Sequence, residues 1–187
     1  MQTVEESFVG TYEVKRSKFI THLVPIEKYK GLQEKLKAEH PKSRHTVYAL
    51  RYINEYDQIV ENSSDDGEPK GAAGVPSLNV LRGAELVNVA ILTVRYFGGI
   101  KLGIGGMARA YASAVKEAVA VADIIKYEKE YFYEFETSYS DVSKKEYLLK
   151  TLGIEQVTRD FLADKVVWKI ITNEKKLNSF KEQECTR

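Results

Sequence analysis

Basic residues and glycines gather in one short part of the chain, between residues 95 and 109. This glycine-rich segment follows a nearly continuous apolar run, residues 87–97, and leads into an alanine-rich segment. The apolar run predicts a strand buried on both faces, and the alanines predict a helix that begins near Gly105. A glycine-rich connection between a strand and a helix N-terminus leaves unpaired N–H groups beside the positive end of the helix dipole. Such an arrangement suits an anion, and the basic side chains of the segment agree with it.

We predict that this segment binds phosphate, carried by RNA or by a nucleotide. Its glycines would offer backbone N–H groups, its basic side chains would supply charge, and its aromatic residues would stack on bases. The candidate residues are Arg95, Tyr96, Phe97, Gly98, Gly99, Lys101, Gly103, Gly105, Gly106 and Arg109. The alternative is a structural turn whose basic residues are solvated or paired with acids.

Two well-known nucleotide loops fit this segment poorly. Gly98 and Gly103 have the separation of a Walker A loop, but Ile104 and Gly105 stand where lysine and serine or threonine belong. Residues 103–108 satisfy G-x-G-x-x-A, yet the loop after the strand is too long for a Rossmann fingerprint and no later strand ends in a ribose-binding acid.

An acidic turn, residues 64–70, precedes the apolar run. Asp65, Asp66 and Glu68 would either orient the basic residues or hold Mg²⁺, whose preferred ligands are oxygens. His45, at the start of an expected strand, is a supporting candidate, although a histidine there is more often structural. We expect no cofactor other than this Mg²⁺ and no catalytic residue, since neither G-x-S-x-G nor H-E-x-x-H occurs.

The composition indicates a soluble globular protein. The chain has 187 residues, 43% of them hydrophobic, and a formal net charge of +1, so any basic function needs a local patch. A single cysteine excludes a disulfide framework and favours a reducing compartment. We find neither a signal peptide nor a run long enough to span a membrane, and we expect a cytoplasmic protein.

The order of the expected elements predicts an α+β fold in two domains, residues 1–126 and 127–187. In the first, we expect strands at 10–26, 46–53, 58–61 and 87–97, and helices at 27–40, 76–86 and 105–122. In the second, we expect strands at 127–137, 156–162 and 165–172, and helices at 140–153 and 173–184. The order β-α-β-β-α is that of a ferredoxin-like domain that lacks its last strand.

The motifs Ser64-Asp65-Asp66-Gly67-Glu68-Pro69, Arg95-Tyr96-Phe97-Gly98-Gly99-Ile100-Lys101-Leu102-Gly103 and Arg109-Ala110-Tyr111 resemble the IMPACT/YigZ family, in its bacterial two-domain form. The resemblance implies an N-terminal domain of the ribosomal-protein/GHMP-kinase type, an α+β sandwich with a left-handed βαβ unit. It also implies a C-terminal ferredoxin-like domain similar to one in elongation factor G. The phosphate loop of GHMP kinases is not reproduced here, because residues 103–108 contain no serine pair.

The same resemblance implies a role in translation, because the family's eukaryotic member resembles a regulator that blocks activation of a starvation-responsive initiation-factor kinase. Our leading hypothesis is a translation-associated regulator that is not an enzyme. It would bind RNA, the ribosome or a translation factor through the glycine-rich segment. The alternatives are a nucleotide-dependent enzyme that uses the same segment with Mg²⁺, and a protein-interaction module in which the glycines are purely architectural.

Overall fold

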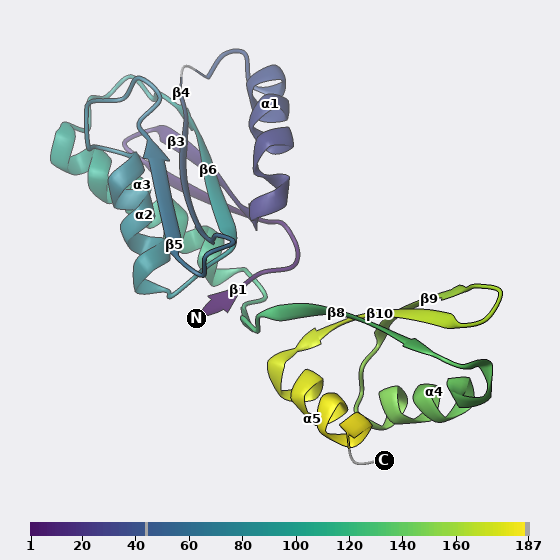
Figure 1. Cartoon of the computed structure of the whole chain (residues 1–187). Coiled ribbons are helices and arrows are strands. Elements are labelled where there is room, and N and C mark those ends of the chain that lie inside the picture. Colours follow the sequence, from purple (N-terminus) through teal and green to yellow (C-terminus); the bar gives the residue numbers. More distant parts are fainter. Residues whose placement is uncertain (44, 186–187) are drawn as a thin grey trace. The chain divides into compact units, whose positions relative to one another are not determined.

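The structure, a computed structural model, describes residues 1–43 and 45–185 of the chain. It contains two compact units, Met1–Tyr127 and Glu128–Arg187, where the sequence placed a boundary after residue 126. Helices and strands are mixed in both units (Figure 1), and the predicted α+β class is confirmed. Among the described residues, no helix combines the length and the apolar character needed to cross a membrane.

The N-terminal unit is built on a five-stranded sheet with the order β2-β3-β6-β4-β5, in which all neighbouring strands are antiparallel. Its strands are β2 (Phe8–Val14), β3 (Ser17–Pro25), β4 (His45–Ile53), β5 (Ile59–Ser64) and β6 (Val89–Tyr96). Its helices are the 3-10 turn η1 (Ile26–Lys28), α1 (Tyr29–Glu39), α2 (Gly74–Gly83) and α3 (Ile104–Ala120). A separate ribbon pairs β1 (Gln2–Thr3), which the sequence did not predict, with β7 (Ile125–Lys126).

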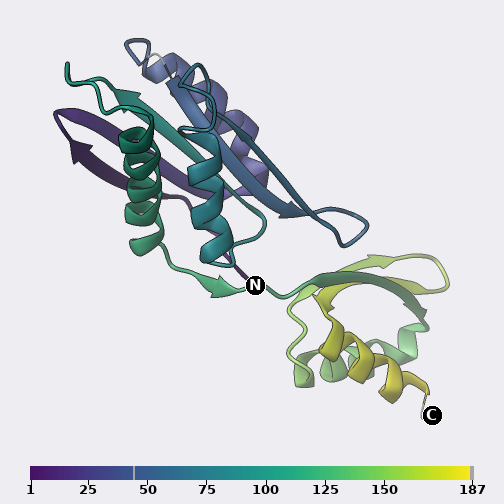
Figure 2. The same ribbon diagram turned by 90° about the vertical axis from the view of Figure 1, so that its left-hand side faces the viewer.

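Strand β6 is the middle strand of the sheet, and seven of its eight residues are buried, as its apolar run predicted. Helix α1 covers one face of the sheet, and α2 and α3 cover the other (Figure 2). Alternate residues of β6 therefore face different helices: Leu92 and Val94 lie in the core under α1, and Ile91 lies in the core under α2 and α3.

Helix α3 lies very close to the sheet because small residues line its inner face. Ala110, Ala114 and Ala118 are buried there. A Cβ atom added to Gly10 of β2 would stand 2.3 Å from the backbone nitrogen of Ala118, so only glycine fits at this contact. The alanine spacing thus fixes the height of α3 above the sheet, and with it the position of the helix N-terminus.

The C-terminal unit has a three-stranded antiparallel sheet with the order β8-β10-β9. Its elements are β8 (Glu130–Thr137), η2 (Tyr139–Asp141), α4 (Val142–Thr151), β9 (Gln156–Phe161), β10 (Val166–Asn173) and α5 (Glu174–Cys185). Both helices pack on one face through Leu149, Leu177 and Phe180. The fully buried Trp168 stacks on Phe135 at 5.7 Å between ring centroids and donates a hydrogen bond from Nε1 to Thr137 Oγ1.

Candidate functional site

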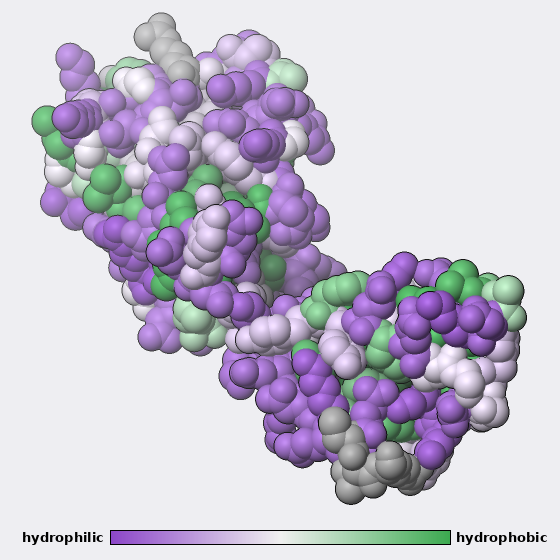
Figure 3. Space-filling model, in the orientation of Figure 1, coloured by the Kyte–Doolittle hydropathy of each residue, from purple (hydrophilic) through white to green (hydrophobic). Residues whose placement is uncertain are grey.

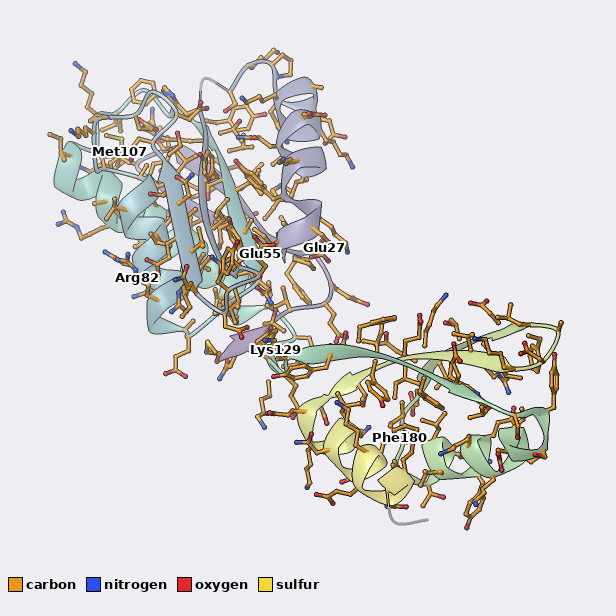
Figure 4. The ribbon with its side chains drawn as sticks, viewed as in Figure 1. Glu27, Glu55, Arg82, Met107, Lys129 and Phe180 are labelled. Carbon is orange, nitrogen blue, oxygen red and sulfur yellow. The ribbon has the colours of Figure 1, made fainter. Side chains whose placement is uncertain are left out.

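The glycine-rich segment forms the connection between β6 and α3. Tyr96 ends the strand and Ile104 begins the helix, so residues 97–103, which we call the glycine loop, lie between them. In the sheet, Arg95 stands between Phe19 of β3 and His45 of β4. Figure 4 shows Met107 where α3 begins, beside this end of the sheet. Residues from three strands, the acidic turn and α3 therefore meet at one place.

Arg95 is buried at this place and already has an acidic partner. Its side chain is 9% exposed, and Nη1 donates to Glu68 Oε1 at 2.7 Å. Tyr111 donates its hydroxyl hydrogen to the same oxygen at 2.8 Å, and its ring is fully buried. Burial, then the neighbouring Glu68, raises the pKa of Tyr111 well above its ordinary value, so the hydroxyl remains a donor. Arg95, Glu68 and Tyr111 thus form one buried, hydrogen-bonded cluster.

Aromatic rings enclose the Arg95 guanidinium on two sides. Its central carbon lies 5.6 Å from the ring centroid of Phe19 and 5.7 Å from that of Phe97. The Nη1 atom also approaches Met107 Sδ at 3.3 Å, and the buried Nε atom has no hydrogen-bond partner among the described groups. Since Phe97 is 60% exposed, it covers the cation and presents its own ring to solvent.

The two aspartates of the acidic turn bind backbone N–H groups. Asp65 accepts hydrogen bonds from Gly71, Ala73 and Gly74, where α2 begins. Burial alone would raise the pKa of Asp65, but these N–H groups outweigh it and the net direction is down. Asp66 Oδ2 accepts from the Thr46 backbone nitrogen at 2.6 Å, and the Asp66 carbonyl accepts from His45 Nδ1 at 2.6 Å.

These contacts engage all three carboxylates of the predicted Mg²⁺ site within the protein itself. The Asp65 and Asp66 carboxylates hold backbone, and Glu68 holds Arg95 and Tyr111. Within residues 1–43 and 45–185, no three His, Cys, Asp or Glu side chains are grouped so as to hold a metal ion. Of the three acids, only Glu68 contacts one of the predicted phosphate-binding cations, namely Arg95.

The glycines of the loop have different structural roles. A Cβ atom on Gly98 would stand 2.0 Å from the Arg16 carbonyl carbon, because the turn between β2 and β3 passes directly beside it. Gly99 and Gly103 have φ angles of +86° and +72°, which favour glycine. Gly105 and Gly106 lie in the first turn of α3, whose cap residue Gly103 makes no side-chain hydrogen bond. The first N–H groups of α3 therefore have no side-chain cap.

The remaining predicted residues divide between two surfaces. Lys101 and Arg109 are exposed, and the Arg109 guanidinium lies over the first turn of α3, 3.7 Å from the Cβ position of Gly105. Phe97, Ile100 and Ile104 are 60%, 43% and 65% exposed, and apolar surface is visible at this end of the N-terminal unit (Figure 3).

Tyr96, in contrast, faces α1, where its hydroxyl contacts His40 Nδ1 at 2.7 Å. Tyr96 and the loop therefore lie on opposite faces of the sheet.

The predicted site omitted several residues of this cluster, among them Tyr111 and Met107. Tyr111 and Met107 lie four positions apart on the buried face of α3, and both contact the Arg95–Glu68 pair. The available signal was their position among the alanines that face the sheet. A tyrosine on a buried helix face requires a hydrogen-bond partner, and Glu68 supplies it.

Comparison with known proteins shows that this site lies within a domain shared with other proteins. The profile of the Impact N-terminal domain matches residues 15–119, which include the acidic turn, the glycine loop and most of α3. The chain belongs to the IMPACT family. An IMPACT family member of Haemophilus influenzae is 35% identical over 156 residues, which are 81% of this chain and 75% of that protein.

Other IMPACT proteins extend the comparison. The family member YvyE of Bacillus subtilis is 41% identical over 120 residues, 63% of this chain and 54% of YvyE, so the match spans about half of that relative. A crystal structure described as that of a hypothetical protein has a TM-score of 0.67 at 28% identity. It covers 97% of this chain and 89% of its own, and the similarity therefore extends over both units.

Proposed function

We propose that this IMPACT-family protein is a translation-associated regulator that binds RNA through the glycine loop and the start of α3. Membership of the family supports the role in translation. The nature of the exposed groups supports RNA as the ligand. Lys101 and Arg109 would contact phosphates, the first N–H groups of α3 would donate hydrogen bonds to a phosphate oxygen, and Phe97 would stack on a base.

The observation that carries the proposal is the contrast between these cations and Arg95. Lys101 and Arg109 are exposed and form no ion pair in the part of the chain that the structure describes, whereas Arg95 is buried against Glu68. An exposed cation can exchange its counterions for phosphate, but a buried and neutralised one cannot. In this proposal Arg95 therefore supports the loop from beneath, through Phe97, and does not contact RNA.

The test is binding of a single-stranded RNA oligonucleotide at several salt concentrations, measured by fluorescence anisotropy. Loss of two phosphate contacts in Lys101→Ala/Arg109→Ala should flatten the slope of log K against log salt by about 1.4. Lys30→Ala/Lys37→Ala is the matched control, because it removes two exposed charges from α1 and leaves the loop intact. Equal slopes for the two double variants would reject the loop as the RNA site, and no binding by the native protein would reject RNA.

A second candidate, binding of a translation factor or a ribosomal protein at the same loop, is favoured by its apolar side chains. Phe97, Ile100 and Ile104 are all exposed, and RNA contacts need only the aromatic one. Replacement of Ile100 and Ile104 by serine should then abolish co-sedimentation with purified ribosomes, yet leave the salt slope for free RNA unchanged. If the isoleucine-to-serine variant still co-sediments with ribosomes as the native protein does, the protein-partner candidate is rejected.

A further inference from the structure

A groove on the other face of the sheet, between α1 and β3, has the character of a small-molecule site. It has a volume of about 360 Å³, which falls within the usual range of ligand sites, about 300–1,000 Å³. Val24, Leu32 and Leu36 form its apolar part, and His22 lines it from β3. Because α1 and α3 cover opposite faces of the sheet, this groove is independent of the glycine loop.

His22, which lines this groove, carries an unsatisfied polar atom. Its Nε2 atom is buried and has no hydrogen-bond partner among the described groups. Burial, then the nearby His40, lowers the pKa of His22; Glu39 opposes this effect and Lys35 adds to it, and the net shift favours the neutral ring. A buried polar atom without a partner is unfavourable, and a ligand that supplies the partner removes that cost.

The rim of the groove carries a net positive charge. Lys28 and Lys35 are both exposed, and they lie seven positions apart, about two helical turns or 10 Å. Lys35 has one loose contact, 3.7 Å from Glu39, and Lys28 forms no ion pair within the described residues. With Lys28, Lys35 and Glu39 together, the rim has a net charge of about +1, next to the apolar residues of the groove. An amphipathic anion matches both features.

Gly31 keeps the mouth of the groove open. It lies inside α1, where glycine is less favourable than alanine, and no atom outside its own helix backbone and its two chain neighbours lies within 4 Å of the position of an added Cβ. A side chain at this position would therefore project into the mouth without displacing its neighbours.

We propose that this groove binds a small aliphatic carboxylate. The aliphatic chain lies along Val24, Leu32 and Leu36. The carboxylate accepts a hydrogen bond from His22 Nε2 and faces the Lys35 ammonium group. Nothing in this assignment depends on the glycine loop or on RNA.

The test uses octanoate, added to the whole protein and followed by the ¹H–¹³C signals of the histidine rings. The chain has three histidines, and His45 lies on the far face of the sheet as an internal reference. We expect a saturable shift of the His22 signal and a rise of its pKa, because a bound carboxylate favours the imidazolium. Octanol, which has the same chain length and no charge, should bind at least tenfold more weakly. Equal binding of octanol, or a shift that does not saturate, would overturn the proposal.

Two pairs of variants separate the groove from non-specific binding. Gly31→Leu should block the mouth and abolish the shift, whereas Gly31→Ala should bind octanoate as the native protein does. Lys28→Gln/Lys35→Gln should weaken binding at least fivefold, and Lys30→Gln/Lys37→Gln should not. Thermal unfolding checks that Gly31→Leu remains folded. Undiminished binding by Gly31→Leu or by Lys28→Gln/Lys35→Gln would place octanoate elsewhere and reject the groove.

Discussion

The acidic turn and the glycine loop belong to one stretch of sequence, but the polar groups of the turn bind other groups of the protein, whereas those of the loop are exposed. In the acidic turn, Asp65 and Asp66 bind backbone N–H groups and Glu68 binds Arg95 and Tyr111. In the glycine loop and the start of α3, Lys101, Arg109 and the first helical N–H groups meet solvent. The comparison teaches that charge and glycine content do not by themselves identify a binding surface. Changes in the turn should reduce stability, and changes in the loop should reduce binding.

The sharpest test of this contrast is Glu68→Ala, which leaves the Arg95 guanidinium buried without its partner. We expect the free energy of unfolding to fall by about 3–5 kcal/mol, the usual effect of removing one member of a buried ion pair. Urea denaturation followed by far-UV circular dichroism measures it. Glu68→Gln keeps an acceptor oxygen for Tyr111 and should lose less. An effect of the size of a surface substitution, about 0.5 kcal/mol, would show that the pair does not stabilise the fold.

Asp65→Ala should have the next largest effect, because three backbone N–H groups, of Gly71 and of Ala73 and Gly74 at the start of α2, lose their acceptor. We expect a loss of about 2–3 kcal/mol. Since the pKa of Asp65 is lowered in the folded state, its contribution is present above its ordinary value of 3.8 and is lost as the pH falls through the folded value. The variant should therefore lose less stability on acidification than the native protein does. Parallel acid dependences of the two proteins would contradict this assignment.

Gly98→Ala tests a close backbone contact at which the glycine loop itself is structural. The added Cβ would overlap the backbone of Arg16 and Ser17, and we expect a loss of about 1–3 kcal/mol from overpacking. Gly105→Ala is the matched control: its Cβ would have ordinary contacts inside α3 and should stabilise the helix by up to about 1 kcal/mol. Opposite signs in urea denaturation would confirm that the two glycines differ in role. A neutral Gly98→Ala would mean that the turn at Arg16 yields easily.

Lys101→Ala/Arg109→Ala should have the smallest effect on stability, within about 0.5 kcal/mol, because both side chains are exposed and form no ion pair with any described residue. The same variant should show the largest loss of RNA binding. If it unfolds as readily as Glu68→Ala, the contrast between turn and loop fails.

The fold was largely predictable from the sequence, because its main elements have strong local patterns. The apolar run of β6, the alanine spacing of α3 and the alternation in β8 each indicated the observed element. The start of α2 was less predictable: we expected residue 76, but the helix begins at Gly74. The reason is the Asp65 carboxylate, nine positions upstream, which holds the Gly74 N–H group.

The site was less predictable because its decisive contacts join distant residues. Arg95 and Glu68 lie 27 positions apart, and nothing local showed that they form a buried pair. Strand alternation separates Tyr96 from Arg95, but a strand buried on both faces conceals which side each residue takes. The predicted site residues lie mostly in one stretch of the sequence, and only tertiary packing divides them into internal and exposed groups.

The burial of Trp168 has a practical consequence for all of these measurements. It is the only tryptophan of the chain, and it lies in the core of the C-terminal unit against Phe135. Intrinsic fluorescence excited at the indole band therefore reports on that unit alone, and the N-terminal unit signals only through its tyrosines. A variant whose circular dichroism curve shifts while its tryptophan emission curve stays in place would show that the two units unfold as separate cooperative systems.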